Sequence, residues 1–565
     1  MMAIQDPSFK RSGSPFSGRN ATRQRPTFRR LIGGYCGTFC GIRAVAKEVH
    51  VGVTLTQRDA SRFKTWQIGL LALFVSLAIG IHPGASWGSS AYDPTSDPYS
   101  MQSITAADGS QAWWNAGYTG KGVDVAVIDT GVTPVPGLNA SGKVINGPDL
   151  SFESQNPSLQ YLDTNGHGTF MAGLIAGNDG QPGGYRGVAP DARIVSLKVG
   201  VADGGVDVSQ VIAAIDWVVQ HRNDNGMNIR VINLSYGTNS TQPYQVDPLA
   251  YAVEQAWKAG IVVVAAAGNS GYEKGASAQG LADPAYDPQI IAVGAADSNG
   301  TGVPWDDSVA AFSANAASCS SACRAPDLIA PGNHMQGLRV PGSYIDQNNP
   351  AGVLSDRYFR GSGTSEATAF VSGAVADLLQ RYPQLTPDQV KTMLSCDKLS
   401  SFNWKQEGCG ELDMNKLLNT SVPSMAVSQQ ANAPGTGTGL LEASRGTDHL
   451  TSNGFVLQGE QDIFGKPFVS SAMAALEASG SSWSAGMWNG SVWTGSSWSG
   501  SSWSGSSWSG NSWSGSSWSG SSWSGNSWSG SSWSGSSWSG SSWSGSSWSG
   551  SSWSGGSWLG ASWGP

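Results

Sequence analysis

Charged side chains are scarce in this chain. They make up 13% of its 565 residues, and residues 481–565 contain none. Residues 1–64 hold 12 of the 32 Lys and Arg but only 3 of the 40 Asp and Glu. The other 20 basic and 37 acidic residues give the rest of the chain a net charge of −17. Because nucleic acid is held largely by basic side chains, this acidic balance argues against a nucleic-acid partner.

Long apolar runs are rare as well. The run from Ile68 to Ile81 has 14 uncharged, mostly apolar residues, whereas a membrane-spanning helix needs about 20. It follows Arg58, Arg62 and Lys64, and small residues follow it up to Ala91. This pattern is typical of a signal peptide. We therefore expect export with cleavage near Ala91, and a permanent membrane anchor is the alternative.

The stretch before this signal is much longer than a signal peptide requires. A translation start near Val45 to Val53 would explain its length. The expected organisation is a basic extension (1–64, for which a mis-assigned start is the alternative), a signal peptide (65–91), a spacer (92–105), a folded domain (106–418), a linker with a small docking element (419–480) and a repeat tail (481–565).

Cysteine is scarce too, with six in the chain, of which two precede the signal. The other four form two close pairs in sequence, Cys319 with Cys323 and Cys396 with Cys409. In an oxidising compartment, local disulfides within each pair are expected. A zinc site would need paired CxxC or histidine ligands, and neither pair has a histidine close by. No metal site and no cofactor is predicted.

The folded domain alternates apolar β-branched runs with segments of helical period, which predicts an α/β layer with a mainly parallel sheet flanked by helices on both faces. The expected strands are Val123–Ile128, Arg193–Val199, Ile229–Ser235, Ile261–Ala267 and Ile290–Gly294. The expected helices are Gly168–Gly177, Asp207–Arg222, Asp247–Ala259 and Ser365–Tyr382. A further helix should begin after Thr386, which opens a capping box followed by proline.

The tail has a tryptophan at every fifth residue from Trp483 to Trp563, 17 in all, mostly as SSWSG. Five residues fit neither a helical turn nor a heptad, and tryptophans at odd spacing would alternate between the faces of a strand. Glycine and serine leave little to bury besides indole. We expect a disordered or loosely stacked adhesive tail, with a β-solenoid-like stack as the alternative.

Four polar residues stand in motifs that carry chemistry. Asp129 ends the apolar run VDVAVI, His167 stands between two glycines, Asn269 follows VVVAAAG, and Ser365 opens a helical segment of small and apolar residues. A hydroxyl needs a base to take its proton, the base needs an orienting group, and the resulting oxyanion needs fixed donors. These four residues supply those groups.

These motifs occur in one order together with RGVAPDARIVSLKV, INLSYG, IIAVGAAD and DLIAPG. The set, from about Ala106 to Leu418, resembles the subtilisin-like (subtilase) serine peptidases, and secreted actinobacterial members with a Trp-Ser-Gly tail in particular. The serine box departs from the commonest family form, with Glu366 for methionine, Ala369 for proline and Phe370 for histidine. Many subtilases also have a prodomain ahead of the catalytic domain, and we expect no room for one here.

The resemblance implies an exported serine endopeptidase, monomeric, that cleaves polypeptides. Ser365 would form the acyl-enzyme, His167 would be the general base oriented by Asp129, and Asn269 would donate to the oxyanion. The residue before the scissile bond would meet Leu234, Ser235, Tyr236, Gly237, Ala266, Ala267 and Gly268.

Two further interpretations stay open. The tail could attach the protein to cell-wall glycan, or it could be a spacer that tolerates aggregation. A catalytically degenerate envelope or binding protein, in which the tail carries the function, is the alternative to an enzyme.

Overall fold

The computed structural model describes residues 92–181, 183–271, 280–317, 323–395, 403–452 and 455–493, with four short strand segments at 497–500, 517–520, 557–558 and 562–563. The expected basic extension and signal peptide lie outside these residues. None of the helices in the described part of the chain is long and apolar enough to cross a membrane.

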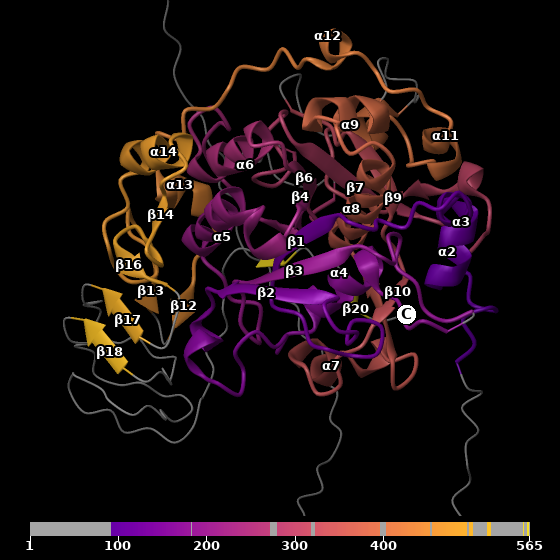
Figure 1. The fold of residues 1–565 in the computed structure, drawn as a ribbon, viewed down its shortest axis with the longest axis horizontal. Coiled ribbons are helices and arrows are strands. Elements are labelled where there is room, and N and C mark those ends of the chain that lie inside the picture. The colour runs from indigo at the N-terminus through magenta and orange to yellow at the C-terminus, as the bar shows by residue number, and fades with distance from the viewer. Residues whose placement is uncertain are drawn as a thin grey trace, which may run out of the picture. The chain divides into compact units, whose positions relative to one another are not determined.

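A mainly parallel sheet forms the centre of the fold (Figure 1). Within the described residues it has eight strands in the order β2-β3-β1-β4-β6-β7-β8, and β9 also pairs with β7. The pairing of β7 with β8 is antiparallel and the others are parallel. The bounds are β1 Asp124–Asp129, β2 Val144–Asp149, β3 Arg193–Lys198, β4 Ile229–Leu234, β6 Val262–Ala266, β7 Ile291–Asp297, β8 Ser308–Val309 and β9 Leu328–Pro331.

Helices flank this sheet in two packed pairs, α4 with α8 and α5 with α6. Their bounds are α4 His167–Ala176, α5 Val208–His221, α6 Pro248–Lys258 and α8 Thr364–Arg381. Every residue of β1 and β6 is buried, as expected of strands covered on both faces. The α/β class with a mainly parallel sheet is confirmed.

The expected elements are present with small shifts of their ends. The five expected strands are β1, β3, β4, β6 and β7, and the capping box at Thr386 opens α9, Pro387–Leu394, with both of its reciprocal bonds. Strands β2, β8 and β9 of this sheet were not predicted. The sequence of β2, VINGPD, mixes apolar residues with Asn, Gly and Pro, and β9 is four residues long.

A second, smaller sheet joins β10 (Met335–Leu338), β11 (Tyr358–Ser362) and β20 (Ser562–Trp563). The two-residue strand β5 (Tyr236–Gly237) pairs with β19 (Ser557–Trp558). Two of these partners come from the last repeats of the tail.

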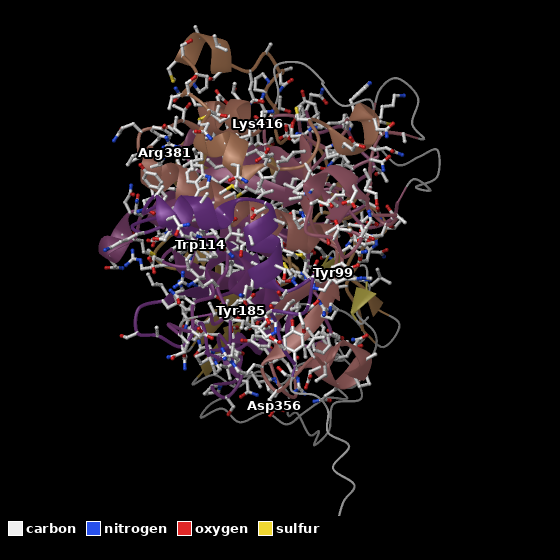
Figure 2. All side chains as sticks on the ribbon, turned by 90° about the vertical axis from the view of Figure 1, so that its right-hand side faces the viewer. Tyr99, Trp114, Tyr185, Asp356, Arg381 and Lys416 are labelled. Atoms are coloured by element: carbon white, nitrogen blue, oxygen red, sulfur yellow. The ribbon has the colours of Figure 1, made fainter. Side chains whose placement is uncertain are left out.

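The expected spacer contains helix α2, Met101–Ala107, capped by Ser100. Arg360 forms an ion pair with Asp97 at 2.7 Å, and its guanidinium lies over the ring of Tyr99. Tyr99 is labelled in Figure 2, which views the domain from the side. Residues 92–105 are therefore packed onto the domain rather than acting as a free spacer.

Parts of the region expected as a linker with a small docking element, and the start of the expected tail, also pack on the domain. Helices α13 (Leu441–Arg445) and α14 (Ser470–Ala478) and strands β14 (Trp483–Ser484), β15 (Met487–Trp488) and β16 (Ser491–Val492) lie along α5 and α6 (Figure 1). Arg445 is buried and pairs with Asp207, the N-cap residue of α5, at 2.9 Å. We call residues 433–493 the C-terminal cap.

The first three repeat tryptophans belong to this cap and are buried. Nε1 of Trp483 donates to the carbonyl of Ala213 at 2.8 Å, and Nε1 of Trp488 donates to Asp216 at 2.7 Å. Trp488 and Trp493 meet edge to face with their centroids 5.3 Å apart. This differs from the disordered tail expected, because α5 supplies the partners that indoles in a Gly-Ser sequence otherwise lack.

Farther along the tail, β17 (Ser497–Gly500) pairs in parallel with β18 (Ser517–Gly520). Ser497 lies opposite Ser517 and Trp498 opposite Trp518, an offset of four pentapeptides. The pairing is of the kind expected from the solenoid-like alternative.

Candidate active site

Asp129 and His167 are brought together where the parallel strands of the main sheet end. Asp129 is the last residue of β1, and His167 is the first residue of α4. His167 Nδ1 lies 2.8 Å from Oδ1 and 3.0 Å from Oδ2 of Asp129, and both residues are fully buried. A buried carboxylate on Nδ1 holds the proton there and leaves Nε2 as the basic nitrogen.

Glycine is required beside His167. A Cβ at Gly168 would collide with the backbone oxygen of Gly131 and would lie 3.1 Å from Oδ1 of Asp129. Gly166 has φ of 108°, in the left-handed region that other residues rarely adopt. The two glycines therefore let the helix begin directly against the carboxylate.

Asp163 fixes the same turn. Its carboxylate accepts hydrogen bonds from the backbone N–H of Gly166 and of Thr169, each at 2.7 Å, and from Oγ1 of Thr130 at 2.8 Å. The first turn of α4 is thereby tied to the end of β1.

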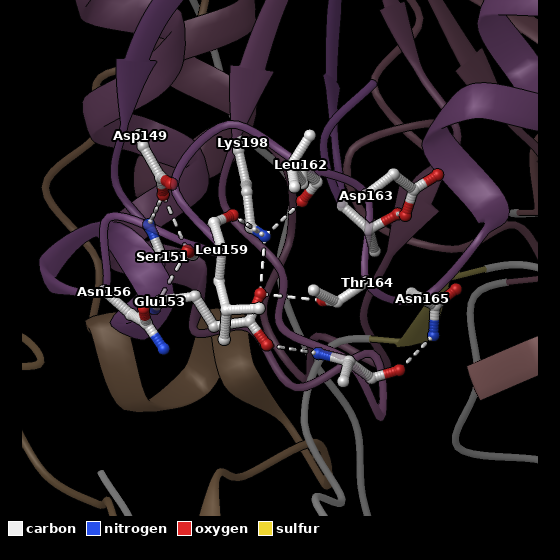
Figure 3. Close-up of polar contacts among 12 residues, drawn as sticks. Asp149, Ser151, Glu153, Asn156, Leu159, Leu162, Asp163, Thr164, Asn165 and Lys198 are labelled. Carbon is white, nitrogen blue, oxygen red and sulfur yellow. Dashed lines mark hydrogen bonds and ion pairs between the residues drawn. The ribbon is translucent and has the colours of Figure 1, made fainter. Parts of the chain in front are cut away.

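A buried ammonium anchors the loop that leads to His167 (Figure 3). Lys198 is the last residue of β3, and its Nζ donates to Glu153 Oε2 and to the carbonyl of Leu162, each at 2.5 Å. Glu153 also accepts from Thr164 Oγ1 at 2.7 Å. The charge of Lys198 thus organises carbonyl and carboxylate oxygens that would otherwise repel one another.

Ser365 is the second residue of α8 and is buried. Its Oγ donates to the carbonyl of Ser235 at 3.3 Å, and Oγ of Ser235 donates to the carbonyl of Ser365 at 3.1 Å. Its backbone N–H lies in the first turn, where a helix has unsatisfied donors. Ser365 is therefore fixed between the start of α8 and the end of β4.

Asn269 lies beside this helix start. Its Oδ1 accepts from the backbone N–H and from Oγ1 of Thr364, each at 2.9 Å. Oγ1 of Thr364 also accepts from the N–H of Gly268 at 3.1 Å. Because Thr364 holds the amide oxygen, the NH₂ group of Asn269 points away from Thr364 and can donate a hydrogen bond to a ligand.

The residues expected to line the substrate pocket lie next to Ser365. Leu234 ends β4, Ser235 exchanges hydrogen bonds with Ser365, and Tyr236–Gly237 forms β5. The side chains of Leu234 and Tyr236 belong to the hydrophobic core, so these residues offer backbone to a ligand. Ala266, Ala267 and Gly268 are buried at the end of β6.

Glu366, which departs from the commonest serine box, gives the site an electrostatic feature. Its carboxyl is fully buried, and neither oxygen has a hydrogen-bond partner among the described residues. Burial raises the pKa of Glu366 to about 7, and His167 acts in the opposite direction. Burial acts to lower the pKa of His167, but Asp129 and then Glu366 raise it, and the net shift is upward.

Cys323 and Cys409 are both disulfide-bonded. The expected partners, Cys319 and Cys396, lie outside the described residues, so the pairing itself stays a prediction. Among the described residues, no three His, Cys, Asp or Glu side chains gather in a way that could hold a metal ion.

The model of the Subtilase family matches residues 120–407. The serine protease AprX of Bacillus subtilis (strain 168) is 40% identical over 293 residues, which are 51% of this chain and 63% of AprX. Subtilisin DY of Bacillus licheniformis is 36% identical over 299 residues, 53% of this chain and 90% of that protein. A crystal structure of a cold-adapted subtilisin-like serine proteinase is 30% identical, with a TM-score of 0.38 over 52% of this chain and 89% of that one.

The chain belongs to the subtilase family. Its named relatives are serine proteases, which supports a serine endopeptidase.

Proposed function

We propose that the protein is an exported serine endopeptidase that hydrolyses peptide bonds through an acyl-enzyme on Ser365. The observation that carries this proposal is the buried ion pair of His167 with Asp129, combined with a buried serine at the start of α8. His167 Nε2 takes the hydroxyl proton during attack and then gives it to the leaving amine. Asp129 holds the ring in the required tautomer.

The hydroxyl of Ser365 has to turn for this reaction. Its Oγ donates to the carbonyl of Ser235, and we propose that rotation about χ1 brings it to His167 during the reaction. Catalytic hydrogen bonds often form only in the complex with substrate. The bond to Ser235 is therefore a resting contact.

The oxyanion would be stabilised by two donors. One is the backbone N–H of Ser365, and the other is the NH₂ group of Asn269, whose oxygen is held by Thr364. Donors fixed before the reaction need no reorganisation when the charge develops.

We propose polypeptide substrates bound as an extended strand along residues 234–237. The small residues Ala266 and Gly268 beside that edge favour a large apolar side chain before the scissile bond. We further propose that the protein acts as a monomer outside the cell and that its tryptophan tail retains it on cell-wall glycan, since indole can stack on the faces of sugar rings. If the tail does this, the full-length protein pellets with cell-wall polymer and protein ending at residue 493 does not; equal pelleting refutes the idea.

The test of the catalytic proposal compares the secreted protein with its Ser365→Ala variant. We expect a fluorophosphonate probe to label the first and not the second, and casein cleavage to vanish in the variant. Labelling without casein cleavage would indicate narrow specificity. Absence of labelling in folded wild-type protein would contradict the proposal and favour a degenerate domain.

A further inference from the structure

Two strands from the end of the tail pair with the two backbone edges that flank Ser365. Strand β19 pairs antiparallel with β5, with Ser557 opposite Gly237 and Trp558 opposite Tyr236. Strand β20 pairs antiparallel with β11, with Ser562 opposite Ser362 and Trp563 opposite Gly361. In this sheet β11 lies between β10 and β20, which are both labelled in Figure 1.

Both strands, β5 and β11, lie close to Ser365. Strand β5 follows Ser235, whose carbonyl accepts the hydrogen bond from Ser365 Oγ. Strand β11 ends at Ser362, three residues before Ser365. The four backbone steps from Trp558 to Ser562 can extend at most about 14 Å. Strands β19 and β20 thus pair with the chain on the two sides of the nucleophile.

The direction of this passage is that of a substrate. In β19 the tail runs from Gly237 toward Ser235, which is the edge assigned to residues before the scissile bond. It then continues to β11, on the other side of Ser365. A peptide bound in the opposite direction would present its carbonyl group to the nucleophile from the wrong side.

The sequence changes at the same place. Between β19 and β20 the chain reads Leu559-Gly560-Ala561, where the usual repeat would read Ser-Gly-Ser. Leu559 is the one large aliphatic residue after Val492. A leucine followed by glycine agrees with the large apolar side chain proposed above for the residue before the scissile bond.

We propose that strands β19 and β20 of the tail act as a tethered peptide ligand of the two substrate-binding edges, β5 and β11, bound in the substrate direction, and that they compete with other substrates. This inference rests on the proposed peptidase function of the same cleft. Tethering gives such a ligand a local concentration in the millimolar range, so even a weak peptide holds the cleft.

The test uses binding and not turnover, because turnover would consume the ligand. In the Ser365→Ala background, a fluorescent peptide of residues 557–565 (SWLGASWGP) is titrated against the full chain and against a chain ending at residue 556. We expect the shortened chain to bind the peptide at least about tenfold more tightly, because its cleft is open. Equal affinity for the two chains overturns the proposal.

Two controls sharpen the result. A peptide of residues 512–520 (SWSGSSWSG) has the same length and tryptophan spacing, and equal binding of both peptides would overturn the assignment to the last repeat. In the full chain, Trp558→Pro removes a backbone donor from β19 and changes no residue of the folded domain. We expect it to bind the added peptide as the shortened chain does, and no gain in binding contradicts the pairing.

These measurements separate the inference from the function on which it rests. Failure of the fluorophosphonate test with tight binding of the peptide would leave a peptide-binding cleft without catalysis. Labelling of wild-type protein with no peptide binding would leave a peptidase whose tail does not enter its cleft.

Discussion

The indole of Trp488 donates to the carboxylate of Asp216 at 2.7 Å in a fully buried contact between the C-terminal cap and α5. Burial raises the pKa of Asp216 to about 7, although the indole acts to lower it. The carboxyl of Glu477, on α14 of the cap, is also buried, and burial and Asp216 raise its pKa well above the usual value. The seam between the cap and the domain therefore favours protonated carboxyl groups.

The first prediction concerns this seam. Because the pKa of Asp216 is higher in the docked state than in the exposed state, stability from docking is complete at low pH and is lost as pH rises from about 4 to about 7. Asp216→Asn should flatten that dependence, measured as the rate of proteolytic nicking of the cap against pH. The exposed Asp224→Asn serves as the control, and an unchanged pH dependence in Asp216→Asn would contradict the prediction.

Glu366 should set the acid limb of activity. His167 must be neutral to act as a base, so activity rises as pH passes upward through its pKa, and Glu366 raises that pKa. Glu366→Gln should therefore move the acid limb of kcat/KM to lower pH. Asp377→Asn is the matched control, because Asp377 is also buried on α8 without hydrogen-bond partners among the described residues, about 16 Å farther along the helix. A shift of the same size in both variants would rule out a specific effect of Glu366.

Lys198 should be essential for stability. Its replacement by methionine leaves Glu153 without its counter-ion, and breaking a buried pair in this way costs about 3–5 kcal/mol. Lys258 provides the comparison, because its side chain is 51% exposed and pairs with the buried Glu254 at a longer 3.4 Å. A pair whose cation stays in water contributes at most about 1 kcal/mol. Urea denaturation of Lys198→Met and Lys258→Met measures both, and similar losses of unfolding free energy would refute the role of burial.

Asn269 should act on the chemical step. Asn269→Ala is expected to lower kcat by about 10²–10³ with little change in KM, because the donor acts on charge that develops in the transition state. Thr364→Val removes one of the two bonds that hold the amide oxygen and should produce a smaller loss in the same parameter. A change confined to KM would assign Asn269 to substrate binding instead.

The sequence predicted the parts of the site that depend on chain order. Asp129 and His167 stand at the junctions of apolar runs with glycine-rich turns, and parallel strands bring such junctions to one edge. It could not predict the contacts of Glu366, because a single substitution in a motif does not reveal which buried groups surround it. The rotamer of Ser365, turned to Ser235, also depends on packing around the helix start.

The sequence composition gave the wrong expectation for residues 481–493, the end of the C-terminal cap. A Gly-Ser sequence with regular tryptophans has little to bury by itself, which is why disorder was expected from about residue 481. Partners on α5, the carbonyl of Ala213 and the carboxylate of Asp216, lie some 270 residues earlier in the chain. No local pattern could pair them with Trp483 and Trp488.

The parallel pairing of Trp498 with Trp518 has a consequence for how the tail behaves between molecules. Because most repeats are identical, a ladder that slips by five, ten or fifteen residues sets the same side chains opposite one another, and a strand from a second copy fits equally well. Strands from the identical repeats can therefore pair equally well in several registers, within one molecule or between two copies. The last repeat contains Leu559 and differs from the others, so its side chains match a partner in one register only.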